Sequence, residues 1–337
     1  MTTKISIALA SYNGENYIWE QLESFTNQTR HPDELIICDD CSTDRTLEIV
    51  KKFAQKAPFP VQVTANKKNI GYIKNFSNAL ALCSGDIVLI SDQDDVWLPT
   101  KIAIIESYFS AHTEVRLVIH DIAYCKQDLT PIGQTKIERM RDEFDLDFHY
   151  VVGMASAIRG DFLKHCLPIP QCGRMTHDRW LHSCAHALGA KVIVGDMLAL
   201  HRRHNNNVTK KSLLNVDFIT SYGHFSPHRL SLTERMKRMR CDILSNSEES
   251  SVLLDWLTRN RDVFVEAGYG EPAELDNRID NLRLRHEAEV MRTIILTAGR
   301  LEGFINIINL YRSGGYCYFR GWKSIIGDII FRCFFHL

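Results

Sequence analysis

The sequence feature that most constrains the fold is the alternation of short apolar runs with helical segments in the N-terminal part. Five mainly apolar runs, each bounded by polar or turn residues, are typical of buried strands: Ile5–Ala10, Leu35–Cys38, Val61–Thr64, Ile87–Ile90 and Val115–Ile119. The intervening segments repeat apolar residues every three or four positions, as helices do: Glu15–Thr26, Asp44–Gln55, Ile73–Cys83 and Thr100–Ser110. This order predicts an α/β fold with a mostly parallel sheet and helices on both faces.

The chain has 337 residues, and at roughly 150 residues per domain this length predicts about two domains. After about residue 215 the pattern changes to charged helical segments: Leu230–Leu244, Ser251–Ala267 and Ala273–Leu296. We therefore expect one α/β domain over residues 1–215, with halves 1–110 and 111–215, and a helical C-terminal region over residues 216–337.

Charge and hydropathy exclude several classes of partner. The formal net charge is −1, so the chain lacks the basic field that nonspecific nucleic-acid binding requires. The apolar run Ile5–Ala10 is too short for a signal peptide, and no run reaches the roughly 18 apolar residues of a spanning helix. We expect a cytoplasmic protein that does not bind nucleic acid and recognises any charged partner locally.

Three carboxylates, Asp92, Asp94 and Asp95, directly follow the fourth predicted strand. Ligands of open parallel sheets bind outside the carboxyl ends of the strands. Carboxylates this close repel one another unless a cation joins them, and hard oxygen ligands suit Mg²⁺ or Mn²⁺ bridging a diphosphate. The alternative is a solvated acidic loop that caps the next helix. A second pair, Asp39 and Asp40, follows the second strand, where carboxylates can accept hydrogen bonds from a base or a ribose.

Several segments together resemble family 2 glycosyltransferases of the GT-A fold, in the family's order over about residues 4–105. These segments are Ser6–Gly14, Asp39–Asp44, Asn69–Gly71 with Asn75, and Ser84–Asp86 leading to Asp92–Trp97. The sequence departs from the family at Cys41, where the family usually has glycine, so we expect a different backbone geometry at that turn.

The resemblance implies roles for individual residues in binding a nucleoside-diphosphate sugar. Asp94 resembles the direct metal ligand of an Asp-x-Asp motif, and Asp92 would lie nearer the ribose or a metal-bound water. The nucleotide-sugar site implied by the resemblance comprises Ala10, Tyr12, Asp39, Asp40, Lys74, Asn75, Asp92, Gln93, Gly153 and Arg203, and its metal ligands Asp94, Asp92 and His204. In this set Ala10 and Tyr12 would border the nucleobase, and Asp39 would accept from it.

The second half supplies a candidate catalytic base, Asp178, which resembles the acidic motif at the start of a helix beneath the acceptor site. Inverting transfer needs one carboxylate to take the acceptor's hydroxyl proton. The alternative is that Asp178 is only a helix N-cap. Gly153 lies in a small-residue segment where backbone can approach a ligand closely. The polar run His201–Thr209 can close over a diphosphate, or it is simply an exposed basic loop.

The resemblance is strongest to bacterial rhamnosyltransferases of surface polysaccharide synthesis, which makes dTDP-L-rhamnose the first donor candidate. UDP-hexoses and UDP-N-acetylhexosamines are the alternatives, and the acceptor would be a saccharide or polyprenyl-linked saccharide. A nucleotidyltransferase is a candidate from another class, but the loop Ser11–Asn16 lacks the basic residues expected of it. A carbohydrate-binding module would not need so many metal-type carboxylates.

The C-terminal stretch Tyr316–Leu337 combines aromatic and basic residues. If a helix begins at Trp322, its apolar positions share one broad face: Ile325, Ile326, Ile329, Ile330 and Cys333. This face would contact the inner surface of the cell membrane, with Lys323 and Arg332 at anionic headgroups and Trp322 and Phe334 at the interface, or it would pack on the helical region or a second subunit.

Overall fold

The computed structural model describes residues 3–140, 150–204 and 232–334, and the chain forms two compact units. The first unit comprises Met1–Ile169 and Thr176–Gly223, and the second comprises Pro170–Met175 and His224–Leu337. The boundary predicted at residue 215 lies outside the described residues. The sequence did not anticipate that residues 170–175 belong with the C-terminal helices.

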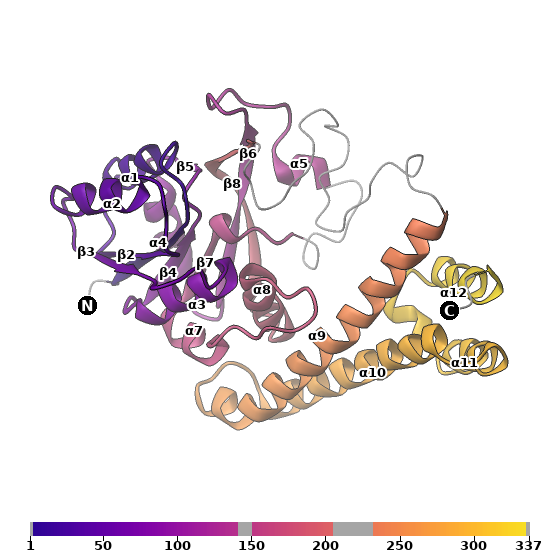
Figure 1. Cartoon of the computed structure of the whole chain (residues 1–337). Coiled ribbons are helices and arrows are strands. Elements are labelled where there is room, and N and C mark those ends of the chain that lie inside the picture. The colour runs from indigo at the N-terminus through magenta and orange to yellow at the C-terminus, as the bar shows by residue number, and fades with distance from the viewer. Residues whose placement is uncertain (1–2, 141–149, 205–231, 335–337) are drawn as a thin grey trace. The chain divides into compact units, whose positions relative to one another are not determined.

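The first unit is built on an eight-stranded sheet with strand order β3-β2-β1-β4-β7-β6-β8-β5 (Figure 1). The strands are β1 Ile5–Ser11, β2 Glu34–Asp39, β3 Val61–Ala65, β4 Ile87–Ser91, β5 Val96–Trp97, β6 Leu117–Cys125, β7 Ser156–Arg159 and β8 Lys191–Arg202. The four strands β3, β2, β1 and β4 are parallel to one another. β7 runs antiparallel to both of its neighbours, and β8 is parallel to β6 but antiparallel to β5.

Helices lie on both faces of this sheet (Figure 1), which confirms the predicted α/β fold. The helices of the first unit are α1 Ile18–Thr26, α2 Thr46–Ala54, α3 Tyr72–Leu82, α4 Lys101–Ala111, α5 Lys136–Met140, the 3₁₀ turn η1 Gly153–Ala155, α7 Gly160–Cys166 and α8 His177–Ala187. Helix α2 begins two residues after the predicted start, and the Asp44 carboxylate accepts from its first amide, that of Thr46, at 2.9 Å. Ser42 does not share this role, because its hydroxyl accepts from Asn13 and donates to Asp39.

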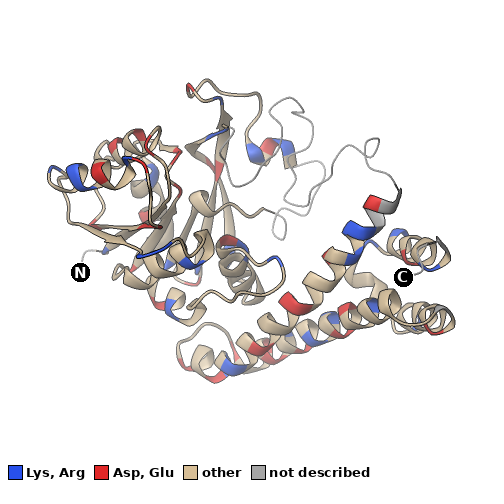
Figure 2. Cartoon of the chain, viewed as in Figure 1, with Lys and Arg blue, Asp and Glu red and all other residues tan. Residues whose placement is uncertain are grey.

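The second unit is helical and contains α9 Leu232–Glu266, α10 Pro272–Thr297, α11 Arg300–Arg312, the 3₁₀ turn η2 Gly315–Tyr318 and α12 Trp322–Phe334. The two predicted helices Leu230–Leu244 and Ser251–Ala267 are one helix, α9, which packs along α10 (Figure 1). Charges of both signs are spread along α9 and α10 (Figure 2). Among the described helices, none has the length and apolar character needed to cross a membrane.

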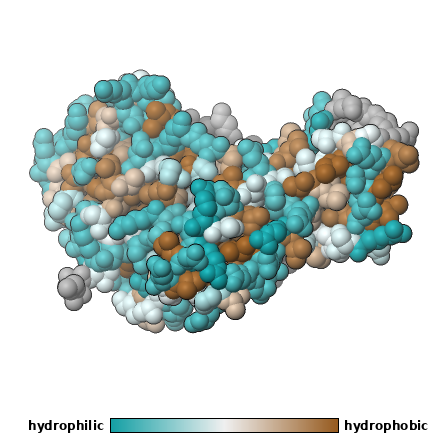
Figure 3. Space-filling view, turned by 90° about the horizontal axis from the view of Figure 1, so that it is seen from below, coloured by the Kyte–Doolittle hydropathy of each residue, from teal (hydrophilic) through white to brown (hydrophobic). Residues whose placement is uncertain are grey.

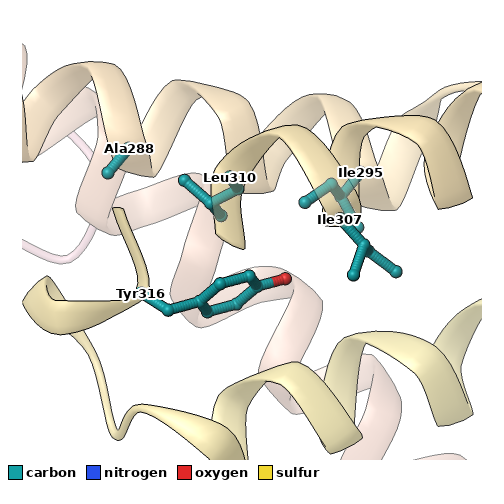
Figure 4. Close-up of a cluster of buried hydrophobic side chains, with 5 residues drawn as sticks. All are labelled: Ala288, Ile295, Ile307, Leu310 and Tyr316. Atoms are coloured by element: carbon teal, nitrogen blue, oxygen red, sulfur yellow. The ribbon is translucent and has the colours of Figure 1, made fainter. Parts of the chain in front are cut away.

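The core of the helical unit lies between α10, α11 and η2. Its buried members are Ala288, Ile295, Ile307, Leu310 and Tyr316 (Figure 4). Beside this cluster, Arg292 donates two hydrogen bonds to the fully buried Asp328, at 3.0 and 2.8 Å, and the Tyr316 hydroxyl donates to the same carboxylate at 2.9 Å. Asp328 is therefore an internal anchor of α12.

The predicted apolar face of α12 is divided by this packing. Ile325 and Ile330 pack against buried clusters of the unit, whereas Ile326 and Ile329 are exposed. Asp328 and Arg332 are buried instead, because paired charged groups can enter a core when each meets a partner. The prediction that Arg332 reaches lipid headgroups is wrong, since its guanidinium donates to the Ala298 carbonyl at 2.6 Å.

Candidate active site

The turn after β4 is fixed to the turn after β1 by the side chain of Gln93. Its amide oxygen accepts from the Tyr12 amide at 2.8 Å, and its amide nitrogen donates to the Tyr12 carbonyl at 2.9 Å. A Cβ at Gly14 would lie 2.3 Å from the same amide oxygen, so glycine is needed there. Gln93, predicted to bind the nucleotide sugar, thus holds together two loops at the carboxyl edge of the parallel strands.

Asp94 and His204 meet at this edge, as the predicted metal site requires. The Nε2 atom of His204 lies 2.8 Å from Oδ2 of Asp94, and the His204 ring lies over Tyr17 with centroids 4.5 Å apart. Among the described residues, no three His, Cys, Asp or Glu side chains converge on one metal position. Asp94 and His204 are thus two candidate protein ligands, and Asp92 is not grouped with them.

This two-residue arrangement fits a hard divalent cation that completes its shell elsewhere. Mg²⁺ in particular is usually held by one or two carboxylates, several waters and the phosphates of a substrate. Both Mg²⁺ and Mn²⁺ prefer oxygen ligands to imidazole nitrogen. A diphosphate would therefore have to supply oxygens that the described side chains do not.

Burial and mutual repulsion affect the Asp92 carboxyl. Burial, followed by the charges of Asp95, Asp94 and Asp178, raises the pKa of Asp92 well above its usual value, against a smaller opposite effect of Lys101. The repulsion expected from the sequence is therefore present. A cation bound at the turn would favour the ionised carboxylates.

Two charged-type residues at the turn are fully buried: Asp95, which was predicted with Asp92 and Asp94, and Lys101, which the sequence did not single out. Asp95 is fully buried, and its Oδ1 accepts from the Arg202 amide at 3.0 Å and lies 2.9 Å from Nδ1 of His201. Lys101 is also fully buried; it donates to the Met154 carbonyl at 2.7 Å. Burial lowers the pKa of Lys101 well below its usual value, although Asp95 and Asp92 favour its charged form.

Arg202 secures the end of β8 against the same turn. Its Nε donates to the Asp94 carbonyl at 3.0 Å, its other nitrogens contact Gln127 and Glu20, and its guanidinium lies 4.9 Å from the Tyr17 ring centre. Arg203, the residue predicted for the nucleotide-sugar site, is buried beside it, with Nη1 3.3 Å from His201. Residues 205–209 of the predicted polar loop lie outside the described residues.

Asp178 lies in the first turn of α8, but it is not the N-cap. Thr176 is the N-cap and accepts from the Arg179 amide, so the N-cap explanation of Asp178 is wrong. The Asp178 carboxylate accepts from Thr176 and from the Arg179 amide. Burial acts to raise the pKa of Asp178, but His177, the Thr176 hydroxyl, His182 and the Arg179 amide together lower it below its usual value.

The backbone of Gly153 lies against this helix start. A Cβ added there would lie 2.7 Å from Nε2 of His177, so packing against α8 already requires glycine at this position. His177 itself is buried and stacks on Phe76 with centroids 3.8 Å apart. The predicted approach of a ligand to Gly153 remains a prediction.

Other predicted binding residues are held mainly by protein contacts. Asp39 is fully buried and accepts from Ser11 and Ser42, whereas Asp40 accepts from the amides of Ile70 and Gly71. The buried Asn75 donates to the Cys38 carbonyl at 2.7 Å and accepts from Asn66 at 2.9 Å. Ala10 is half-buried at the end of β1, and Tyr12 and Lys74 are exposed. These last three residues are free to meet a ligand, and their roles stay predictions.

Cys41 keeps the conformation that glycine favours. Its φ of 63° is left-handed, and the expected difference from the family's turn stays a prediction. A non-glycine residue in this region costs roughly 1–2 kcal/mol, because its Cβ crowds the following carbonyl. The turn is held by the Ser42 amide, which donates to Asp39 at 2.8 Å.

The mixed sheet, with an acidic turn at the carboxyl edge of its parallel strands, agrees with the fold of GT-A domains. Residues 6–166 match the family model described as glycosyl transferase family 2. Residues 6–166, in the N-terminal unit, thus form a domain of this family, which consists of transferase enzymes.

Known proteins similar to the chain agree with this assignment. An uncharacterized protein of Mycobacterium tuberculosis is 28% identical over 216 residues, a match that spans 60% of each chain. The abequosyltransferase RfbV of Salmonella typhimurium is 29% identical over 167 residues, covering 49% of this chain and 48% of RfbV. The fold is similar to the crystal structure of Staphylococcus aureus TarS 1–349 in complex with UDP, with a TM-score of 0.52 and 17% identity over 92% of both chains.

Proposed function

We propose that the chain is an inverting glycosyltransferase that moves a sugar from a nucleoside-diphosphate donor to a hydroxyl group of a saccharide or lipid-linked saccharide. The observation that supports this proposal is the meeting of Asp94 with His204 at the carboxyl edge of the parallel strands. Asp178, in the first turn of α8, is the candidate base. The match of residues 6–166 to a glycosyltransferase family favours this function over a nucleotidyltransferase or a binding module.

In this proposal Asp94 and His204 hold Mn²⁺ or Mg²⁺. When bound, the cation neutralises the charge that develops on the departing diphosphate. The buried Arg202 and Asp95 keep the two ligands in place through the end of β8. Because Tyr17 lies under the His204 ring, the imidazole is already oriented toward Asp94.

Asp178 acts in the proposal as the general base. The acceptor oxygen forms a bond to C1 of the sugar, the bond between C1 and the diphosphate oxygen breaks on the opposite face, and the hydroxyl proton passes to Asp178. The lowered pKa keeps this carboxylate ionised at neutral pH. Its contacts with Thr176 and the Arg179 amide fix its orientation.

The first donor candidate is dTDP-L-rhamnose, and the proposed role is the synthesis of a bacterial surface polysaccharide such as O-antigen or capsule. This choice rests on the resemblance of Ser91–Pro99 and His201–Val208 to rhamnosyltransferases. UDP-N-acetylhexosamine is the second candidate. It is favoured by a match of 95 residues, 39% identical, to the poly(ribitol-phosphate) β-N-acetylglucosaminyltransferase TarS of Staphylococcus aureus.

A panel of nucleotide sugars tests the proposal. The purified chain is incubated with each donor and a saccharide acceptor, with Mn²⁺, Mg²⁺ or a chelator, and released nucleoside diphosphate is measured. We expect release with dTDP-L-rhamnose that depends on the metal. If nucleoside diphosphate is released from UDP-N-acetylglucosamine but not from dTDP-L-rhamnose, the donor is UDP-N-acetylglucosamine instead. Equal release in chelator would contradict the metal role.

A further inference from the structure

Helix α11 is apolar on two opposite faces. Its inner face contributes Ile307 and Leu310 to the buried cluster of Figure 4. On the opposite face Leu301, Ile305 and Ile308, spaced by four and three residues, are 76%, 49% and 50% exposed. Surface helices of globular proteins are normally polar on the outer face. An apolar outer stripe therefore favours contact with an apolar surface outside this unit.

Helix α12 repeats the pattern. Its inner face is formed by Asp328, Phe331 and Arg332, which are buried, and the residues on the opposite side include Trp322 and Ile326. The outer residues Trp322, Ile326 and Ile329 are spaced by four and three positions. All three are exposed, Trp322 most of all at 65%. α11 and α12 also pack against each other, and hydrophobic residues gather toward this end of the molecule in Figure 3.

Charge around the two outer stripes is mainly positive. On residues 301–333 the exposed charged side chains are Glu302, Arg312, Arg320 and Lys323, which gives three cations against one anion. The other acid of this segment, Asp328, is buried against Arg292. An apolar stripe with exposed aromatic residues and flanking cations is the pattern of helices that lie in the headgroup region of anionic membranes.

We propose that the outer stripes of α11 and α12, Leu301, Ile305 and Ile308 with Trp322, Ile326 and Ile329, bind the surface of an anionic lipid bilayer. Each helix has 13 residues, a length of about 20 Å, which is shorter than the roughly 30 Å hydrocarbon core. The helices therefore lie along the surface. The positive balance favours anionic lipid over a second copy of the chain, whose same patch would bring like charges together.

The test uses the full chain and vesicles of phosphatidylcholine with or without phosphatidylglycerol, read out by co-sedimentation. Deleting Tyr316 onward is unsuitable, because it would leave the buried Arg292 without Asp328. The test variant is instead the triple substitution L301S/I305S/I308S at exposed positions. We expect the wild type to bind the anionic vesicles and the triple variant to bind at least about tenfold more weakly. The double variant R312Q/K323Q should lose most of the preference for phosphatidylglycerol.

A matched control is V263S/L284S, which removes apolar side chains that are 43% and 51% exposed on α9 and α10. It should bind vesicles like the wild type, and circular dichroism should show that every variant melts like the wild type. Wild-type protein that stays in the supernatant overturns the proposal. So does a concentration-dependent dimer, measured by light scattering, that the triple variant abolishes while vesicle binding is unchanged, since the stripes then cover a second copy.

Discussion

At the residue scale, the acidic turn contains carboxylates of different character. Asp94 faces His204, whereas Asp95 is fully buried and contacts His201 and the Arg202 amide. Both are aspartates in the same turn, so the sequence does not distinguish them. Only their contacts show that Asp94 is a candidate metal ligand and Asp95 an internal anchor. The predictions for single residues follow from this difference.

Asp94→Ala should lower metal-dependent transfer by a factor on the order of 10² or more, because one of two candidate protein ligands is lost. Thermal unfolding should be unchanged, since the substitution also removes a charge that repels Asp92. The measurements are turnover and nucleoside-diphosphate binding with and without Mn²⁺. The control is Asp196→Ala, an exposed carboxylate on β8, which should keep wild-type activity. Normal metal-dependent binding by Asp94→Ala would remove it from the metal site.

Asp178→Asn should lower kcat by a factor on the order of 10² or more and leave donor affinity nearly unchanged, because a base acts in the transition state. The amide oxygen of asparagine still accepts from the Arg179 amide, so α8 should begin at the same place. Steady-state kinetics and donor titration separate the two effects. If donor binding is lost while turnover at saturation is normal, Asp178 belongs to the donor site instead.

Cys41→Gly should raise the free energy of unfolding by about 1 kcal/mol or less. Glycine removes the cost of the left-handed φ of 63°, and the gain is reduced because glycine also gives the unfolded chain more freedom. Urea unfolding measures the change. Cys41→Ala is the matched control, because it keeps a Cβ and should gain nothing; an equal gain in both variants would show that the thiol, not the backbone, is responsible.

At the scale of elements, the buried Lys136 and the half-buried Lys191 fix the segment that leads to η1. The Nζ atom of Lys136, on α5, donates to the Val151 carbonyl at 3.2 Å, and Lys191, on β8, donates to the Tyr150 carbonyl at 2.8 Å. Burial lowers the pKa of Lys136 to about 7. The charged groups that act on it are Asp178, Lys191, Arg203 and Asp121.

This lowered pKa predicts a pH dependence of stability. The unfolded chain holds the Lys136 proton up to about pH 10.5, whereas the folded chain releases it near pH 7. Between these values the unfolded state binds more protons, so the contribution of Lys136 makes the protein more stable as pH rises, by up to about 1.4 kcal/mol per pH unit. Urea unfolding of wild type and Lys136→Met at pH 7, 8 and 9 measures it. Lys136→Met should lack this rise; identical slopes would contradict the assignment.

At the scale of the whole molecule, the chain enters the helical unit twice. Residues 170–175, which lead directly into Thr176 and α8, belong to that unit. The Gly173 amide donates to Glu248 at 2.9 Å, and the Arg174 amide donates to Glu249 at 2.9 Å and to Ser245 at 2.8 Å. The two units are therefore joined by more of the chain than a single linker.

Glu249→Ala should loosen this segment, because the amide of Arg174 loses an acceptor and a buried carboxylate is removed from a contact with Ser245. We expect faster amide hydrogen exchange at Gly173 and Arg174 and a loss of about 1–3 kcal/mol in unfolding free energy. Glu287→Ala, an exposed glutamate on α10, is the control. Unchanged exchange at both amides would mean that α9 does not hold the segment.

The sequence by itself determined the α/β class and the edge of the sheet at which the candidate site residues lie. Periods of two and about 3.6 residues are local properties, so strands and helices can be identified from short windows. Because parallel strands share a carboxyl edge, acidic residues after β2 and β4 were correctly expected at one edge of the sheet. The broad helical character of the C-terminal region was predictable for the same reason.

Only the tertiary structure decided which side chains meet. Asp94 and His204 are 110 positions apart, and the Gln93 amide pairs with the Tyr12 backbone across 81 positions. Lys101 has no distinguishing feature in the sequence, and only the packing shows that it is buried beside the acidic turn. Likewise, helical spacing could not tell which apolar residues of α12 face inward, because the buried pair of Arg292 and Asp328 sets the rotation of that helix. Such pairings depend on how distant segments approach, which no local period encodes.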